Sequence, residues 1–299
     1  MSIPARTAFI PEIVGDTLMF NAMAFNTASW NLSRILGPAL AGFMIAVFAD
    51  GDTTSAYGVG LVYFVLSGLY FISAVTVLLI RHSGRPNHQA SGSPLQELHE
   101  GFTYVLSSAV VGGLILLSIL PFLFGLTINT LLPAFSTDIL RGGPEDLGLL
   151  MTGMGVGAIL GSLALTKMSS IRNKGYWLLG TSVLWGALVA GFGLTTDFII
   201  ATIIIGLIGF ISAVNMSMNR SLVQLQVEQR MRGRIMSIDM MSHGLMPIGV
   251  LPIGYIAETV GIPTGLVVSG LILCISTIIL GAMMPKVRSI NLGYQGEVI

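Results

Sequence analysis

Long stretches without a charged side chain follow one another along almost the whole chain. A helix needs about 20 mainly apolar residues to cross the hydrocarbon core of a bilayer. A backbone in lipid must also satisfy its hydrogen bonds within helices or a closed barrel, and the stretches lack the alternating pattern of barrel strands. We therefore predict an all-α integral membrane bundle of eight transmembrane helices, the first extending back to Phe25, at 35–49, 53–80, 101–137, 147–166, 175–196, 198–219, 240–257 and 259–285.

The composition agrees with a membrane bundle and excludes several other classes of protein. Of the 299 residues, 53% are hydrophobic and 9% are charged, whereas soluble domains carry roughly 25% charged residues. The 14 basic residues balance the 14 acidic ones, so net charge gives no reason to expect a nucleic-acid partner. The single cysteine, Cys274, excludes a disulfide framework and a multi-cysteine metal site. We expect no cofactor and no metal.

Charge in the connecting segments predicts the orientation of the bundle. The segments on the opposite side hold seven acidic residues and only one basic residue, Arg141. The other 13 Lys and Arg residues lie in alternate segments, namely those up to Arg34 and at 81–100, 167–174, 220–239 and 286–299. The positive-inside rule places this second set in the cytoplasm. We expect a multi-pass protein of the inner (cytoplasmic) membrane with both termini in the cytoplasm.

The segment 81–100 is the longest predicted cytoplasmic link. Ser93 and Pro94 form a helix-capping pattern with proline at the first helical position. Apolar residues follow at helical spacing, which predicts an amphipathic helix on the membrane before the third span. We therefore expect three parts: residues 1–80 as part of an N-terminal bundle, 81–100 as a cytoplasmic central link, and 101–299 as a C-terminal six-helix bundle.

Two cytoplasmic segments look alike and indicate an internal repeat. Arg6 and Arg220 each precede a short helix and a span that contains a proline, Pro38 in one case and Pro252 in the other. Duplicated six-helix transporters show parallel repeats of this size. If the second half opens near Leu95, about 120 residues of the first half, or four spans, would be absent from this chain. The eight spans would then be the last eight of twelve.

Six segments are informative together, namely 4–12, 31–42, 131–135, 138–140, 148–161 and 232–237. They resemble the major facilitator superfamily, and within it the enterobactin-exporter-like branch of drug and siderophore efflux proteins. The resemblance implies helices five to twelve of that fold and proton-coupled efflux by alternating access. It also implies an antiporter-type element at Gly37-Pro38 and a gating loop at Arg232-Gly233-Arg234. The segment 167–174 keeps the basic residues of the family's Gly-x-x-x-Asp-Arg gating motif but lacks its aspartate.

Charged and polar residues inside spans are the candidates for substrate or proton handling, because they are expensive in lipid. Arg34, flanked by Asn31, could pair with an anionic substrate group or with a carboxylate on another helix. Its alternative role is to extend toward the cytoplasmic interface and orient the span. Asn129 and Thr130 in the third span are candidate cavity residues, because the resemblance implies that this helix lies beside the central cavity.

Two further positions lie close to the predicted cytoplasmic boundary. Asn215 in the sixth span is a weaker candidate for the cavity. Asp239 and His243 are four residues apart, so they could face each other on one side of a helix. Histidine titrates near neutral pH, which makes a proton-sensing pair possible, and a polar cap at the interface is the alternative.

Small residues in the fourth span indicate close helix packing. Gly153, Gly157 and Gly161 recur every four residues, the spacing that lets two transmembrane helices approach closely. Such a surface could slide during alternating access or serve packing alone. We group these glycines with Gly37, Pro38, Pro252 and the 232–234 loop as candidate packing and gating residues.

Three functions follow from the sequence. The first is secondary active efflux of a small amphipathic molecule, of the drug or siderophore class, coupled to protons. The second is a truncated membrane protein without transport activity. The third is a membrane-embedded enzyme. The sequence gives this function no support, because it contains no His-Glu-x-x-His, Gly-x-Ser-x-Gly or Walker motif. The expected partners are a small-molecule substrate, protons and lipid, and nothing in the sequence implies an oligomer.

Overall fold

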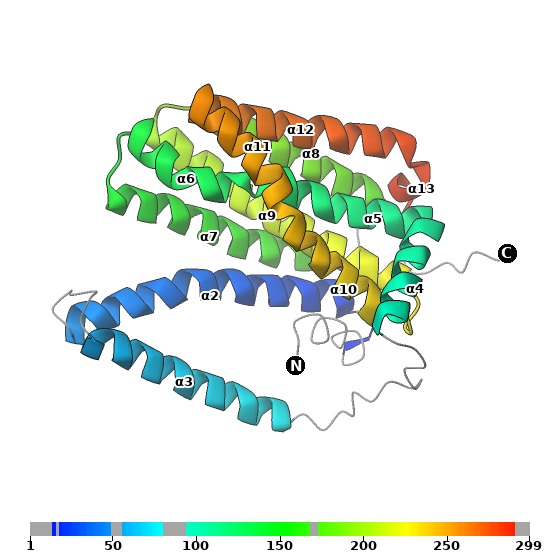
Figure 1. Ribbon diagram of the computed structural model, residues 1–299, viewed down its shortest axis with the longest axis horizontal. Coiled ribbons are helices and arrows are strands. Elements are labelled where there is room, and N and C mark those ends of the chain that lie inside the picture. The colour runs from blue at the N-terminus through cyan, green and yellow to red at the C-terminus, as the bar shows by residue number, and fades with distance from the viewer. Residues whose placement is uncertain (1–13, 16–17, 49–55, 80–93, 168–172, 291–299) are drawn as a thin grey trace. The chain divides into compact units, whose positions relative to one another are not determined.

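The computed structural model of the chain describes residues 14–15, 18–48, 56–79, 94–167 and 173–290. All regular structure in these residues is helical (Figure 1). Seven helical segments are long and apolar enough to cross a membrane. They correspond to the second through eighth predicted spans. The first predicted span falls in α2 (Met19–Phe48), a 30-residue helix that is not among those seven.

The chain divides into two compact units, one formed by residues 1–29 and 88–299 and the other by residues 30–87. The second unit contains the end of α2 and α3 (Ala56–Leu78). Within α3, the membrane-spanning window buries none of its residues, and most of its large exposed side chains are apolar. A helix that is apolar all round suits a lipid environment.

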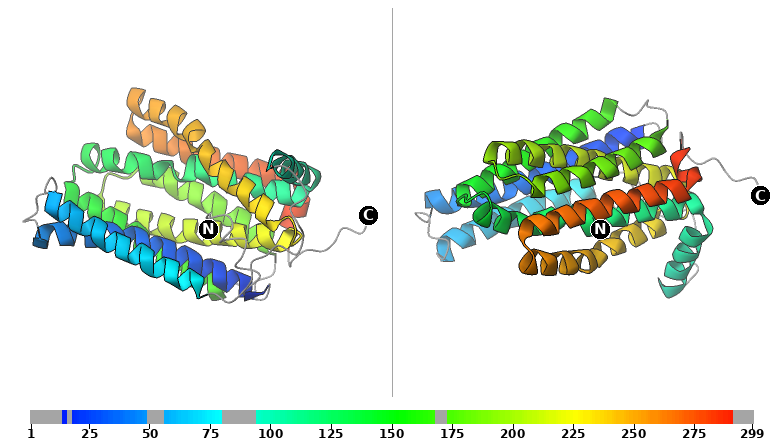
Figure 2. Two further views of the ribbon diagram at one scale, coloured as in Figure 1. Left: turned by 60° about the horizontal axis from the view of Figure 1, so that its bottom comes forward. Right: turned by 90° about the horizontal axis from the view of Figure 1, so that it is seen from above.

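The larger unit holds the remaining helices. Their bounds are α4 (Pro94–Ser107), α5 (Ala109–Leu120), the π-helix η2 (Pro121–Gly125), α6 (Thr127–Asp138), α7 (Pro144–Lys167), α8 (Lys174–Gly193), α9 (Phe198–Gln226), α10 (Arg232–Ser242), the 3₁₀-helix η3 (His243–Leu245), α11 (Met246–Thr259), α12 (Ile262–Met283) and α13 (Pro285–Arg288). Long helices of this unit run alongside one another in both further views (Figure 2). The bounds show that two predicted spans, 101–137 and 240–257, are interrupted helices and not single straight ones.

Local sequence explains where several of these helices begin. The side chain of Asp197 caps α9 by accepting a hydrogen bond of 2.9 Å from the Ile200 amide. Ser108 caps α5 in the same way, from the Val111 amide. Gly261 has a φ of 124°, which residues with a side chain rarely adopt, and it allows the short turn between α11 and α12. α4 begins at Pro94, where its fixed φ suits the first turn of a helix.

Glycines let α7 and α9 pack at very short range. A Cβ at Gly157 would overlap the carbonyl oxygen of Gly206, and a Cβ at Gly209 would overlap that of Met154. α8 and α12 meet in the same manner through Gly186 and Gly270. Without a hydrophobic driving force between helices in lipid, such close backbone contact is a main source of association.

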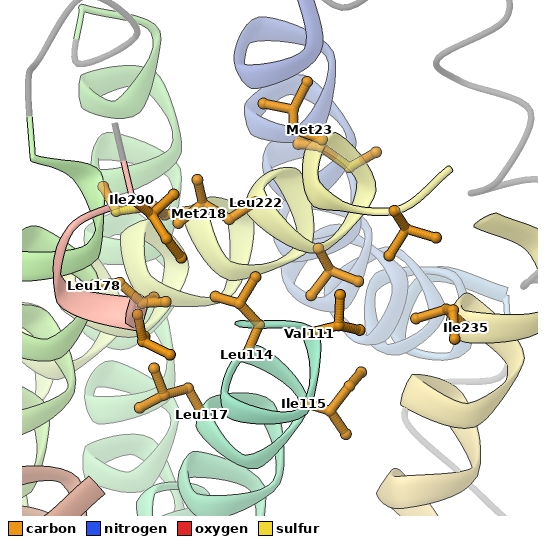
Figure 3. Packing of buried hydrophobic residues seen from close by; sticks show 14 of the residues in the cluster. Met23, Val111, Leu114, Ile115, Leu117, Leu178, Met218, Leu222, Ile235 and Ile290 are labelled. Carbon is orange, nitrogen blue, oxygen red and sulfur yellow. The ribbon is translucent and has the colours of Figure 1, made fainter. Parts of the chain in front are cut away.

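Buried apolar residues form two clusters in the larger unit. One cluster joins α5, α8, α9 and α10 with α13, and includes Leu114, Leu178 and Met218 (Figure 3). It also holds Met19 and Met23 from the start of α2. The other joins α6, α8, α9, α11 and α12 around Trp185. The candidate site lies at the junction of α5 and η2, next to the first cluster.

Candidate functional site

The third predicted span is broken in its middle by a π-helix. Pro121 opens η2, and the five-residue π-helix separates α5 from α6. Proline removes a backbone donor, and the freed groups in a membrane helix must find partners from neighbouring helices or Ser and Thr side chains. The hydroxyl of Ser269 in α12 donates to the Phe124 carbonyl at 2.7 Å. Single-turn π-helices occur frequently at functional sites.

Glycine at two positions holds other helices against η2. A Cβ at Gly249 of α11 would overlap the carbonyl oxygen of Leu123. A Cβ at Gly125 itself would lie 2.9 Å from the indole ring of Trp185. Two neighbouring helices, α8 and α11, therefore pack closely against the π-helix.

A pocket lies on the side of η2 that faces α9. Its cavity volume is about 10 Å³, roughly the room that one water molecule needs. The lining residues come from the end of α5, from η2 and from the second half of α9: Leu117, Ser118, Pro121, Phe122, Asn215, Met216, Asn219 and Arg220.

Asn215, a predicted candidate, lies in this wall with its amide group bound to α8. Its Nδ2 donates to the Leu178 carbonyl at 3.1 Å, to Thr181 Oγ1 at 2.9 Å and to Ser182 Oγ at 2.8 Å. The side chain is 1% exposed. Its donors are therefore used to join α9 to α8.

Asn219 and Arg220 were missed by the sequence reasoning. Asn219 is 3% exposed, and its Nδ2 donates to the Leu114 carbonyl of α5 at 3.2 Å. Its Oδ1 is buried without a hydrogen-bond partner among the described residues. Arg220 lines the same pocket and makes no ion pair with any residue that the structure describes. The signal was the four-residue spacing of Asn215 and Asn219, which places both on one face of a helix.

The other polar candidates lie elsewhere in the fold. Asn129 is half-buried and Thr130 is exposed in α6, and neither lines the pocket. Asp239 is 1% exposed in α10, whereas His243 begins η3 after α10 has ended at Ser242. The predicted four-residue pair thus spans a junction between two helix types. The side chain of His243 is outside the described residues.

Four candidates of the first predicted span belong to α2. The helix runs through Asn31, Arg34, Gly37 and Pro38, whose side chains lie outside the described residues. At an earlier position of the same helix, Ser217 of α9 donates a hydrogen bond to Thr27. This bond joins the start of α2 to the helix that carries Asn215 and Asn219.

The predicted gating loop contacts the helix of the central link. Arg234 in α10 forms ion pairs with Glu97, at 3.3 Å, and with Glu100, both in α4. Gly101 lets the two helices approach, since a Cβ there would lie 2.8 Å from Ile238. Arg232 donates to the Val227 carbonyl at 3.3 Å, and Gly233 is exposed. The inner face of α4 therefore packs on α10, a contact that the sequence prediction did not include.

The remaining predicted packing residues lie in α7 and α11. Gly157 and Gly161 of α7 meet the backbone of α9 at Gly206 and Phe210. The packing at Gly153 is looser, because a Cβ there would lie 3.6 Å from the side chain of Thr202. Pro252 lies inside α11 and is exposed. Among the described residues, no group of His, Cys, Asp and Glu could hold a metal ion.

Comparison with known families agrees with this architecture. Residues 1–294 match a family of the major facilitator superfamily that is described as "Transmembrane secretion effector". The chain belongs to the major facilitator superfamily. It is thus a multi-span membrane protein of a transporter family, as the resemblance of its sequence segments predicted.

Individual relatives in the superfamily are similar at modest identity. A staphyloferrin A transporter of Staphylococcus aureus is 27% identical over 261 residues, which are 87% of this chain and 62% of the relative. The enterobactin exporter EntS of Shigella boydii is 27% identical over 236 residues, 79% of this chain and 54% of the relative. The same exporter of Escherichia coli O81 is 28% identical over the same length. The chain thus spans little more than half the length of these relatives.

Proposed function

We propose that this chain belongs to a secondary active transporter that exports a small amphipathic molecule, of the drug or siderophore class, across the inner membrane. The observation that carries the proposal is the family match over residues 1–294, together with relatives named as a siderophore transporter and as exporters. The pocket beside η2 supports it from the structure, because it brings polar groups to a helix break inside the membrane. Export runs by alternating access and is coupled to proton entry.

The geometry suggests how the parts contribute. The α7–α9 contact, in which glycines leave only backbone between the helices, is a smooth surface along which helices can shift. Arg34, Asn31, Asn129, Thr130 and Asn215 remain candidates for cargo contact, and Asp239 and His243 for the coupling proton. The ion pairs of Arg234 hold the central link to α10 while the helices rearrange.

Comparative metabolite analysis of the native organism tests export directly. A strain in which the gene is deleted is compared with the parent and with the deletion strain carrying the gene on a plasmid. We expect at least one amphipathic metabolite to accumulate inside the deletion strain and to fall in its medium, with both changes reversed by the plasmid. Identical metabolite levels in all three strains, in media with and without iron, would contradict the proposal.

A further inference from the structure

α4 changes direction just before the third span begins. The helix ends at Ser107, Ser108 has extended backbone angles (φ −101°, ψ 107°), and α5 starts at Ala109. Ala109 is also the first residue of the membrane-spanning segment that continues to Asp138. In Figure 1 and in the right-hand view of Figure 2, α4 runs across the ends of the long helices, whereas α5 runs alongside them. The last turn of α4 therefore lies at the edge of the membrane-spanning region.

Contacts within the protein hold α4 in this direction. A Cβ at Gly112 of α5 would lie 2.9 Å from the carbonyl oxygen of Val105, so the absence of a side chain lets α5 come close to α4. On the same side of α4, Gly101 allows the approach of Ile238, and Arg234 pairs with two glutamates of the helix. Both Gly101 and Val105 are buried. One side of α4 is thus fixed to α5 and α10 by close packing.

The side of α4 that faces away from α10 is divided along its length into an apolar row and a polar row. Phe102 and Leu106, one helical turn apart, are 43% and 84% exposed. With 3.6 residues per turn, the centres of the two rows are about 110° apart around the helix axis, and exposed His99 lies between them. Such a division is typical of helices that lie in the surface of a membrane. The polar row consists of four exposed residues: Gln96, Glu100, Thr103 and Ser107.

The charges of α4 favour no particular lipid head group. The helix contains no Lys or Arg, and both of its glutamates, Glu97 and Glu100, pair with Arg234. Attraction to anionic lipids depends on basic residues near the membrane surface. Contact between α4 and a bilayer would therefore depend on the removal of Phe102 and Leu106 from water.

We propose that the apolar row of α4 lies in the interfacial layer of the bilayer, with the polar row turned toward water. Leu106 precedes the first residue of the span, Ala109, by three residues, or about 5 Å of helix rise. Its side chain is therefore within reach of the hydrocarbon edge, and Phe102 follows the same row outward along the membrane surface. Because its other side packs on α10, α4 connects the predicted gating loop to the bilayer.

The proposal refines the membrane helix that the sequence predicts. The spacing in the sequence places the apolar residues of this segment together on the membrane, but Leu98 and Val105 pack with the buried cluster of the protein. The lipid contact is thus confined to Phe102 and Leu106. This inference goes beyond the proposed function, because it requires only that the chain spans a membrane.

Spin labels on the two rows test the contact. In the natural protein carrying Cys274→Ala, Leu106→Cys and the matched control Thr103→Cys are labelled separately with a nitroxide and reconstituted in phosphatidylcholine vesicles. Collisions with oxygen, which concentrates in lipid, are compared with collisions with a water-soluble nickel chelate. We expect the oxygen-to-nickel collision ratio to be several-fold higher at position 106 than at position 103. The ratio at 106 should stay the same in vesicles that also contain phosphatidylglycerol, because no basic residue takes part.

The other possible results would overturn the proposal. Frequent nickel collisions at 106, or equal ratios at 106 and 103, would place the apolar row in water. Low collision rates with both reagents at 106 would mean that protein covers the row. A ratio at 106 that rises only with phosphatidylglycerol would mean that charge makes the contact. If Leu106→Cys is not recovered in membranes, Phe102→Cys on the same row is measured instead.

The same experiment keeps this inference apart from the proposed function. None of the collision measurements requires transport. A protein that shows the expected ratios but exports nothing would keep the membrane contact of α4 and remove the export function. A protein that exports its cargo while position 106 collides mainly with nickel would leave export standing and refute the contact.

Discussion

Gly157 is one of two described glycines, with Gly175, at which an added Cβ would come nearest to a backbone oxygen. A methyl group there would overlap the carbonyl oxygen of Gly206, and backbone cannot move as a flexible side chain can. Gly157→Ala should therefore destabilise the α7–α9 contact by about 1–3 kcal/mol, the usual cost of overpacking. The measurement is the thermal unfolding midpoint of the purified protein in detergent, which we expect to fall.

Gly180→Ala provides the control for this prediction. Gly180 lies inside α8, is exposed, and has nothing within 4 Å of its Cβ position. The same substitution there should leave the midpoint unchanged or raise it, because alanine favours the helix by roughly 0.5–1 kcal/mol. Equal midpoints for the two variants would contradict the close packing of α7 on α9.

Arg34 is the residue for which sequence reasoning makes the sharpest functional prediction. If it pairs with cargo or with a carboxylate during transport, Arg34→Ala should abolish export while the protein still inserts in the membrane. Arg34→Lys, which keeps the charge, should retain part of the activity. Export by Arg34→Ala equal to that of the wild type, at matched expression, would show that the arginine only anchors its span.

At the scale of elements, the contact between α4 and α10 is open to direct measurement. Arg234→Gln removes both ion pairs to Glu97 and Glu100. These side chains are partly exposed, so the expected effect is small, about 0.2–1 kcal/mol, and should shrink at high salt. Hydrogen exchange of the amides in 94–107 should become up to a few-fold faster.

Arg230→Gln again serves as the control for α4. It removes an ion pair within the segment before α10 and should leave exchange in 94–107 unaltered. Exchange that is equally fast in both variants would mean that apolar contacts such as Gly101 with Ile238 hold α4 in place without help from charge.

The elements also indicate what sequence reasoning can predict. Charge-free runs locate the helices well, because lipid forbids unpaired backbone and nearly every charge, so helix ends coincide with polar residues. Breaks inside a span are harder to predict. Pro121 and Pro133 both lie in the third span, yet η2 begins at Pro121 and α6 continues through Pro133. The difference depends on Ser269 and Gly249, which come from helices more than 100 residues away.

In the candidate site, too, local sequence patterns were predictable and contacts between distant helices were not. The sequence identified Asn215 as a polar group that must find a partner, but not that its partners are on α8. Asn219 and Arg220 were missed because their importance depends on Leu114 and on the wall of α5, contacts between positions about 100 residues apart. Pairings of this kind are set by how helices dock, and no local pattern contains that information.

At the scale of the whole molecule, the charge asymmetry predicts the orientation in the membrane. α9 separates the exposed positions Thr196 and Arg230, which lie beyond its opposite ends. In a variant with Cys274→Ala, single cysteines at 196 and 230 are treated with a membrane-impermeant maleimide. The positive-inside rule predicts that Thr196→Cys reacts in spheroplasts and Arg230→Cys only in inverted vesicles. The reverse pattern would contradict the predicted topology.

In the function that we propose, the whole molecule moves a cargo outward at the expense of a proton gradient. Its most direct test is uptake by inverted membrane vesicles that contain the natural protein, energised with ATP and supplied with staphyloferrin A or enterobactin, the cargoes named for its relatives. We expect uptake of at least one of them to exceed that of vesicles lacking the protein and to collapse when a protonophore is added. Uptake that persists undiminished with the protonophore, or that never exceeds the control for either compound, would contradict the account.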